Sequence, residues 1–123
     1  MRIQSAEQLF QGRCKPCEQQ AALYSSNQAI AQLGHLEDWY LVCDGRRIRR
    51  DYTVNNFLAG LALFDKVGRL AEIENHHPDL HLEGYCNVSL ELWTHTIGGL
   101  SVNDFILAAK INGLEKPTGI VVE

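Results

Sequence analysis

The chain has 123 residues, of which 46% are hydrophobic, and a formal net charge of −4. This size and composition fit one domain with a packed core. Direct nucleic-acid binding is not expected, because proteins that grip phosphates are more often basic. No apolar run reaches the roughly 18 residues that a membrane span needs. The first residues lack the apolar stretch of a secretory signal, so we expect a cytoplasmic protein without a membrane segment.

Residues 1–25 are predicted to form an irregular or loosely helical leader, because they contain Gly12 and Pro16 and lead into the polar Ser25-Ser26-Asn27 cluster. Within it, Cys14 and Cys17 have the CxxC spacing of half a zinc site or of a redox pair. No second ligand pair follows, so two reduced thiols are the simpler interpretation. With no secretory signal, a disulfide framework is not expected either.

The next segment predicts a short helix and a hairpin. Residues 27–33 place Ala29, Ile30 and Leu33 on one side of a helix that Gly34 ends. Apolar runs on both sides of Asp44-Gly45 then predict a β-hairpin with a primed turn.

Four arginines flank that turn: Arg46, Arg47, Arg49 and Arg50. Such a run usually belongs to a solvated edge strand that resists aggregation. The alternative is a site for an anionic protein partner.

Residues 57–73 are the longest predicted helix. Its inner face is expected to hold Phe57, Leu61, Phe64 and Ala71, and its exposed stripe Asp65, Arg69 and Glu72. Because Pro78 excludes the helical conformation from its predecessor, His76 and His77 should lie at the helix C-terminus. The partial negative charge of that helix end favours imidazolium.

The second half of the chain predicts another hairpin and a last helix. Residues 80–86 and 88–96 form the hairpin, with Val88, Leu90 and Leu92 on one face and His95 off that face. The helix begins at Ser101 and ends at Gly113. Residues 26–114 are then a single domain, and residues 115–123 a tail. The order α-β-β-α-β-β-α predicts an α+β fold: a small four-stranded antiparallel sheet with helices packed on one face.

Several of these residues suit proton transfer, because histidine can donate or accept a proton near neutral pH. A shared metal is not expected, since adjacent histidines at a helix end point in different directions. Glu72 precedes His76 by one helical turn and can orient its imidazole, or it is only solvated. Asp104 can close a capping box with Ser101, or lie near a substrate. Trp39 is either a core residue or a platform for a flat heterocycle.

Together these residues resemble the pterin-4a-carbinolamine dehydratase family. Its signature runs from a charged residue through His-His-Pro, an aromatic residue and a histidine to an aspartate, at constrained spacings. The chain supplies them in order: Glu72, His76-His77-Pro78, Tyr85, His95 and Asp104. The resemblance extends over residues 36–113 and includes Trp39 before the first hairpin. The CxPC in the leader also occurs in some members, but the Gly and Pro residues that usually follow it are missing here.

The resemblance implies both a fold and a reaction. The fold is the α+β domain described above, assembled as a homodimer or a homotetramer. The reaction removes water from a 4a-hydroxytetrahydropterin, which is the substrate, so no cofactor or metal is expected. His76 and His95 would exchange protons, and His77 would position the pterin or share the role of the base. The expected orienting or substrate-binding residues are Glu72, Pro78, Tyr85, Asp104 and Trp39.

A family resemblance indicates fold more firmly than activity. Some members act as dimerisation cofactors of a transcription factor, and some inactive relatives assist assembly of Rubisco. The complete signature favours the enzyme. A binding role would use the arginines at 46–50.

Overall fold

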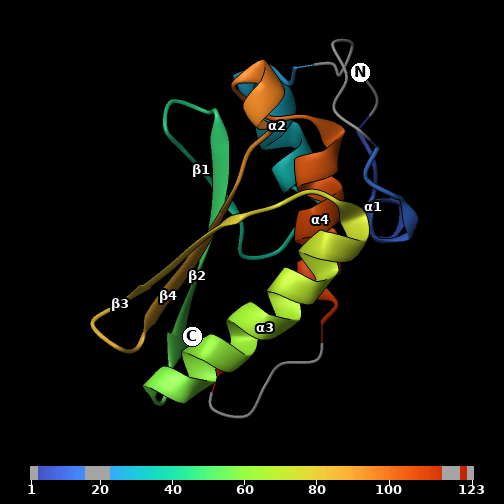
Figure 1. The fold of residues 1–123 in the computed structure, drawn as a ribbon. Helices are drawn as coiled ribbons and strands as arrows, with labels where there is room; N and C mark the ends of the chain where they lie inside the picture. Colours follow the sequence, from blue (N-terminus) through green and yellow to red (C-terminus); the bar gives the residue numbers. More distant parts are fainter. Residues whose placement is uncertain (1–2, 16–22, 115–119, 122–123) are drawn as a thin grey trace.

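The computed structural model describes residues 3–15, 23–114 and 120–121, and the predicted α+β fold is confirmed (Figure 1). The helices are α1 (Ala6–Gln11), α2 (Ser26–Leu33), α3 (Phe57–Glu74), η1 (a 3-10 turn, His95–Ile97) and α4 (Val102–Asn112). The strands are β1 (Tyr40–Val42), β2 (Arg47–Val54), β3 (Asp79–Glu83), β4 (Asn87–Leu92) and β5 (Ile120–Val121). No helix in the described ranges is long and apolar enough to cross a membrane.

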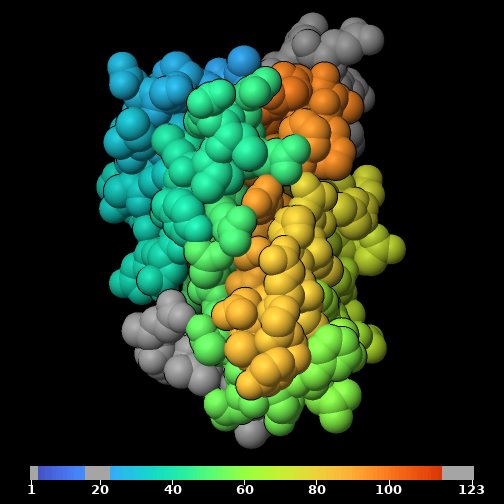
Figure 2. Space-filling view, turned by 90° about the vertical axis from the view of Figure 1, so that its left-hand side faces the viewer, coloured from blue at the N-terminus to red at the C-terminus, as the bar shows by residue number. Residues whose placement is uncertain are grey.

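The sheet is antiparallel, with the strand order β1-β2-β4-β3, and α3 and α4 lie on one of its faces (Figure 1). Side chains at alternate positions of β4, among them Val88, Leu90 and Leu92, point toward these helices and are buried, as predicted. Figure 2 looks at the opposite face of the sheet, where β3 and β4 form a surface that none of the described helices covers.

The first hairpin has the predicted primed turn. Asp44 and Gly45 have φ values of 56° and 80°, and Arg46 N–H donates to Cys43 O at 3.1 Å. Two central residues with positive φ define a type I′ turn, whose twist matches that of the flanking strands. The register follows directly, with Val42 opposite Arg47.

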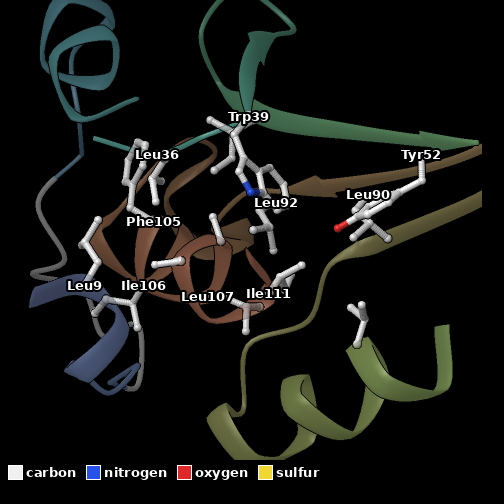
Figure 3. Packing of buried hydrophobic residues seen from close by; sticks show 14 of the residues in the cluster. Leu9, Leu36, Trp39, Tyr52, Leu90, Leu92, Phe105, Ile106, Leu107 and Ile111 are labelled. Carbon is white, nitrogen blue, oxygen red and sulfur yellow. The ribbon is translucent and has the colours of Figure 1, made fainter. Parts of the chain in front are cut away.

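The core lies between the sheet and α4 (Figure 3). Phe105 and Leu107 from α4 belong to the same buried cluster as Leu92 from β4 and Trp39. Ile106 faces α1, where it packs near Leu9. On α4, Phe105, Ile106 and Ala109 are buried, whereas Val102 is half-buried.

The predicted inner face of α3 was right for Ala71 and for the half-buried Phe64, and wrong for the other two residues. Phe57 and Leu61 are exposed, whereas Ala59, Leu63 and Val67 are buried with Ala71. The buried face is made of small and medium side chains because α3 lies close against the sheet: a Cβ on Gly60 would stand 3.1 Å from Leu82 Cδ1. The exposed stripe of Asp65, Arg69 and Glu72 is confirmed.

The terminal segments contribute more structure than the sequence indicates. The leader contains α1, capped by Ser5, and its Leu9 is fully buried in the core. Part of the expected tail forms β5, which pairs with β2 at Thr53 and Val54. Cys17, the second thiol of the CxPC, lies outside the described residues.

In α2, Ala29 is buried as predicted, but Ile30 is 59% exposed. Gln32 takes the inner position instead. Its side-chain amide accepts from Gln4 N–H at 3.0 Å and donates to Gln4 O at 2.7 Å. This pair of bonds fixes the start of the leader.

The four arginines do not form the predicted solvated edge. They flank and enter β2, which lies between β1 and β4. Arg50 is buried, bonded to Asn112 and stacked over Tyr52. Arg47 and Arg49 both pair with Glu91 on the open face. Arg46, by contrast, is exposed and bonded only to the Cys43 carbonyl among the contacts described, and an anionic partner at this region stays a prediction.

Candidate active site

A buried carboxylate–imidazole pair joins two helix ends. Asp104 Oδ1, in the first turn of α4, lies 2.6 Å from Nε2 of His76, just beyond α3. The other oxygen of Asp104 accepts from Thr94 Oγ1–H at 2.8 Å and from Ser101 N–H at 2.9 Å. Because an ionised carboxylate can only accept, a hydrogen bond between these two atoms requires a proton on Nε2 of His76.

The backbone at the end of α3 directs His76 toward α4. Asn75 has a left-handed conformation with φ of 51°, and His76 N–H donates back to Ala71 O at 3.1 Å. With the bond from Asn75 N–H to Glu72 O, this is a Schellman motif. The predicted position of both histidines at a helix C-terminus is confirmed.

Glu72 contacts a different histidine from the one predicted. The turn at Asn75 moves His76 off the helical spacing, so Glu72 does not orient it. Instead, Glu72 Oε2 lies 2.5 Å from Nε2 of His77, and both side chains are exposed. His77 is thus held at the surface, immediately beside the buried His76.

Asp104 combines the two roles that the sequence left as alternatives. Its Oδ2 closes the capping box with Ser101, whereas its Oδ1 binds His76. One carboxylate therefore both starts α4 and fixes the orientation of the imidazole.

His95 lies in η1 rather than in a strand, because β4 ends at Leu92. Its side chain is exposed, which agrees with the prediction that it lies off the face formed by Val88, Leu90 and Leu92. Its ring stacks on Trp93 with the ring centroids 4.1 Å apart. The residue between them, Thr94, donates to Asp104, which connects the backbone at His95 to the His76 pair.

Trp93 is anchored on both its polar and its aromatic side. Its indole N–H donates to Asp79 Oδ2 at 3.0 Å, and the guanidinium carbon of Arg47 lies 4.4 Å from the ring centroid. Trp93 and His95 together present a flat aromatic surface. Thr94, the residue between them, binds Asp104.

Two predicted site residues lie elsewhere in this chain. Trp39 is in the core, with its indole N–H bonded to Asn112, eight residues and about 12 Å of helix from Asp104. Tyr85 is 65% exposed in the β3–β4 turn, separated from the His77 end by β3, about 16 Å of extended chain. Pro78 is half-buried, and directly precedes β3.

Among the described residues, no three His, Cys, Asp or Glu side chains are grouped so as to hold a metal ion. The arrangement instead supplies imidazoles held by carboxylates, which suits acid–base chemistry.

Comparison with known proteins places this geometry in a family. The family model described as pterin 4α-carbinolamine dehydratase matches residues 22–114. The chain belongs to the pterin 4α-carbinolamine dehydratase family. The predicted resemblance is thereby confirmed.

Individual relatives agree with the family model. A mitochondrial protein of Arabidopsis thaliana named pterin-4-alpha-carbinolamine dehydratase 2 is 44% identical over 106 residues, 84% of this chain but 57% of that protein. Proteins of Chlorobaculum tepidum and Dechloromonas aromatica, both named putative pterin-4-alpha-carbinolamine dehydratases, are each 40% identical. The matches cover 87% and 83% of this chain, and 97% and 88% of those proteins.

The fold also occurs in a solved structure. A transcriptional coactivator/pterin dehydratase from Brucella melitensis superposes with a TM-score of 0.67 at 24% identity, over 75% of this chain and 97% of that one. At this identity, the likeness supports the α+β dehydratase fold alone.

Sequence reasoning about this dehydratase-family chain missed Thr94, which is buried and bridges Asp104 and Ser101. A signal was present: Thr94 continues the inward series of Val88, Leu90 and Leu92 by period two. A polar residue at an inward position needs a buried partner.

Proposed function

We propose that this chain dehydrates a 4a-hydroxytetrahydropterin to the quinonoid dihydropterin. The observation that carries the proposal is the buried bond between Asp104 and His76, which fixes the orientation of one imidazole. His77 follows His76 in the chain, and His95 follows Thr94, which also binds Asp104. Membership of the dehydratase family, and the names of relatives about 40% identical, support the same reaction.

The reaction breaks the bond between C4a and its hydroxyl oxygen. The oxygen takes up a proton and leaves as water, while N5 loses its proton and its electron pair forms the C4a=N5 double bond. Two proton transfers at neighbouring positions, the oxygen on C4a and the nitrogen N5, call for two groups that titrate near neutral pH.

We assign the two transfers to His76 and His95, in an order that is left open. His76 has Nδ1 available, because its Nε2 is engaged by Asp104. His95 directly follows Thr94, which binds Asp104, and its side chain is exposed. His77, held by Glu72, is assigned to positioning the pterin or to sharing the role of the base.

Other expectations remain predictions within this proposal. The pterin itself is the substrate, so the proposal requires no metal or organic cofactor. Homodimer or homotetramer formation is expected from the family alone. The cytoplasmic location also stays a prediction, and one relative is named as mitochondrial. The proposal gives Trp39 and Tyr85 no substrate-binding role within one chain. Trp39 lies in the core, and Tyr85 lies in the exposed β3–β4 turn. Nothing favours a chaperone or transcriptional role.

The test is the loss of synthetic 4a-hydroxytetrahydropterin, followed by absorbance. We expect the protein to accelerate the loss, and His76→Ala or His95→Ala to lower turnover at least about tenfold, as expected for a general acid or base. His35→Ala, at an exposed histidine in the α2–β1 connection, is the matched control and should leave turnover unchanged. A folded wild-type protein that gives no acceleration would refute the proposal.

A further inference from the structure

Residues Arg13–Lys15 form a strap that follows α1 and reaches the last turn of α3. Two of its groups bind one carboxylate there. Arg13 Nε lies 3.2 Å from Glu74 Oε2, and Cys14 N–H donates to Glu74 Oε1 at 2.9 Å. Because the side chain of Glu74 is almost fully buried, these contacts compensate a charge that would otherwise be costly inside the protein.

The strap then binds the first turn of α4. Lys15 N–H donates to Asn103 Oδ1 at 3.0 Å, and Asn103 Nδ2–H donates to Lys15 O at 2.6 Å. The Cys14 thiol adds a contact of 3.5 Å to Asn103 O. A side-chain amide that binds both backbone polar groups of one residue fixes that residue in place.

These anchors lie next to the proposed active-site pair. Glu74 is two residues before His76, and Asn103 directly precedes Asp104. The strap and the His76–Asp104 bond therefore connect the same two helix ends. Burial raises the pKa of the Cys14 thiol to about 12, with Glu74 and Asp104 adding to the shift. This agrees with a strap that packs close to Asp104.

We propose that the Arg13–Lys15 strap is a positioning element that sets the spacing between His76 and Asp104. A hydrogen bond of 2.6 Å does not tolerate much drift between the elements that carry it, and small misplacements of catalytic groups are costly in rate. The strap precedes the region that matches the family, residues 22–114, so nothing in that match assigns it a role. The inference rests on the proposed dehydratase function and deepens it.

The test uses Asn103→Ala in the full chain, because alanine removes the clamp but keeps the helical backbone. Three quantities are measured. Alkylation of Cys14, mapped by mass spectrometry, reports whether the strap is docked. The NMR signal of the proton between His76 and Asp104 reports the pair. Steady-state kinetics report kcat and KM for the pterin.

We expect Cys14 to become reactive, the proton signal to move upfield or broaden, and kcat to fall about tenfold with KM little changed. Gln32→Ala is the matched control, since it removes the same two-bond amide clamp, on Gln4, from the same leader. That variant should leave the His76 signal and kcat unchanged.

Two results would overturn the inference. In the first, Cys14 becomes reactive but the proton signal and kcat stay as in the wild type. In the second, Cys14 stays protected, so Asn103 does not hold the strap. If Asn103→Ala does not fold, Glu74→Gln gives the same test from the other anchor. A wild-type protein without dehydratase activity would refute the proposed function, and the proton signal would still decide the role of the strap.

Discussion

Asp104 is the residue on which the candidate site depends. Three donors meet at its carboxylate: the Nε2–H of His76, the hydroxyl of Thr94 and the backbone N–H of Ser101. A buried carboxylate with this number of partners has its orientation fixed, and it fixes the imidazole tautomer in turn. The structure therefore links the start of α4 to the chemistry at His76.

Asp104→Asn should lower kcat at least about a hundredfold, because an amide can offer a donor to Nε2 and favour the wrong imidazole tautomer. Dehydration kinetics measure the effect, and urea unfolding shows whether the variant is folded. Asp65→Asn is the control, since that carboxylate is exposed on α3 and pairs only with Arg69 among the contacts described. Equal kcat for Asp104→Asn and the wild type would contradict an orienting role.

At the scale of elements, each end of α3 and α4 is decided by a local backbone motif. Asn56 caps the start of α3, a left-handed Asn75 ends it, and Ser101 with Asp104 caps α4. The hairpin turn at Gly45 is of the same kind, because its positive φ suits glycine. These motifs are short in sequence, which is why they can be predicted locally.

Gly45→Ala should destabilise the protein by about 1–2 kcal/mol, because a Cβ is unfavourable at a φ of 80°. The new Cβ would also lie 2.8 Å from Ser26 Oγ. The same substitution at Gly68, inside α3 and with nothing within 4 Å of the new Cβ, should stabilise by about 0.5–1 kcal/mol. Urea unfolding of both variants checks the pair, and effects of the same sign would contradict the turn assignment.

At the scale of the whole molecule, the N-terminal leader belongs to the folded domain. Leu9 enters the core beside Ile106, the Gln4–Gln32 bonds hold its first part, and the strap holds its last described part. The sheet, by contrast, leaves one face uncovered, where Arg47, Arg49 and Glu91 form ion pairs (Figure 2).

Leu9→Ala should lower the free energy of unfolding by about 2–5 kcal/mol, as expected for a fully buried leucine. Leu58→Ala is the control, because that side chain is 74% exposed in the chain by itself, and its loss should change stability by less than about 0.5 kcal/mol. Both values come from urea unfolding. A Leu9→Ala variant as stable as the wild type would mean that the leader does not belong to the core.

Much of the fold could be predicted because its signals are local. The type I′ turn, the inward series of β4, the caps of α4 and the end of α3 before Pro78 each depend on a few neighbouring residues. The buried face of α3 could be predicted only in part, at Ala71 and Phe64. Its large residues, such as Phe57 and Leu61, are exposed, and close packing against the sheet selects Ala59 and Gly60 instead.

The candidate site also combines features that are local in the sequence with contacts that depend on tertiary packing. The sequence by itself determined the family, the histidines at the helix end and the capping box of Asp104, because ordered spacing and local backbone geometry carry that information. Only the tertiary structure decided that Asp104 binds His76, that Glu72 binds His77, and that Thr94 joins the network. The reason is physical: a left-handed residue at Asn75 rotates the chain, and partners distant in sequence meet only after α3, α4 and the sheet have packed.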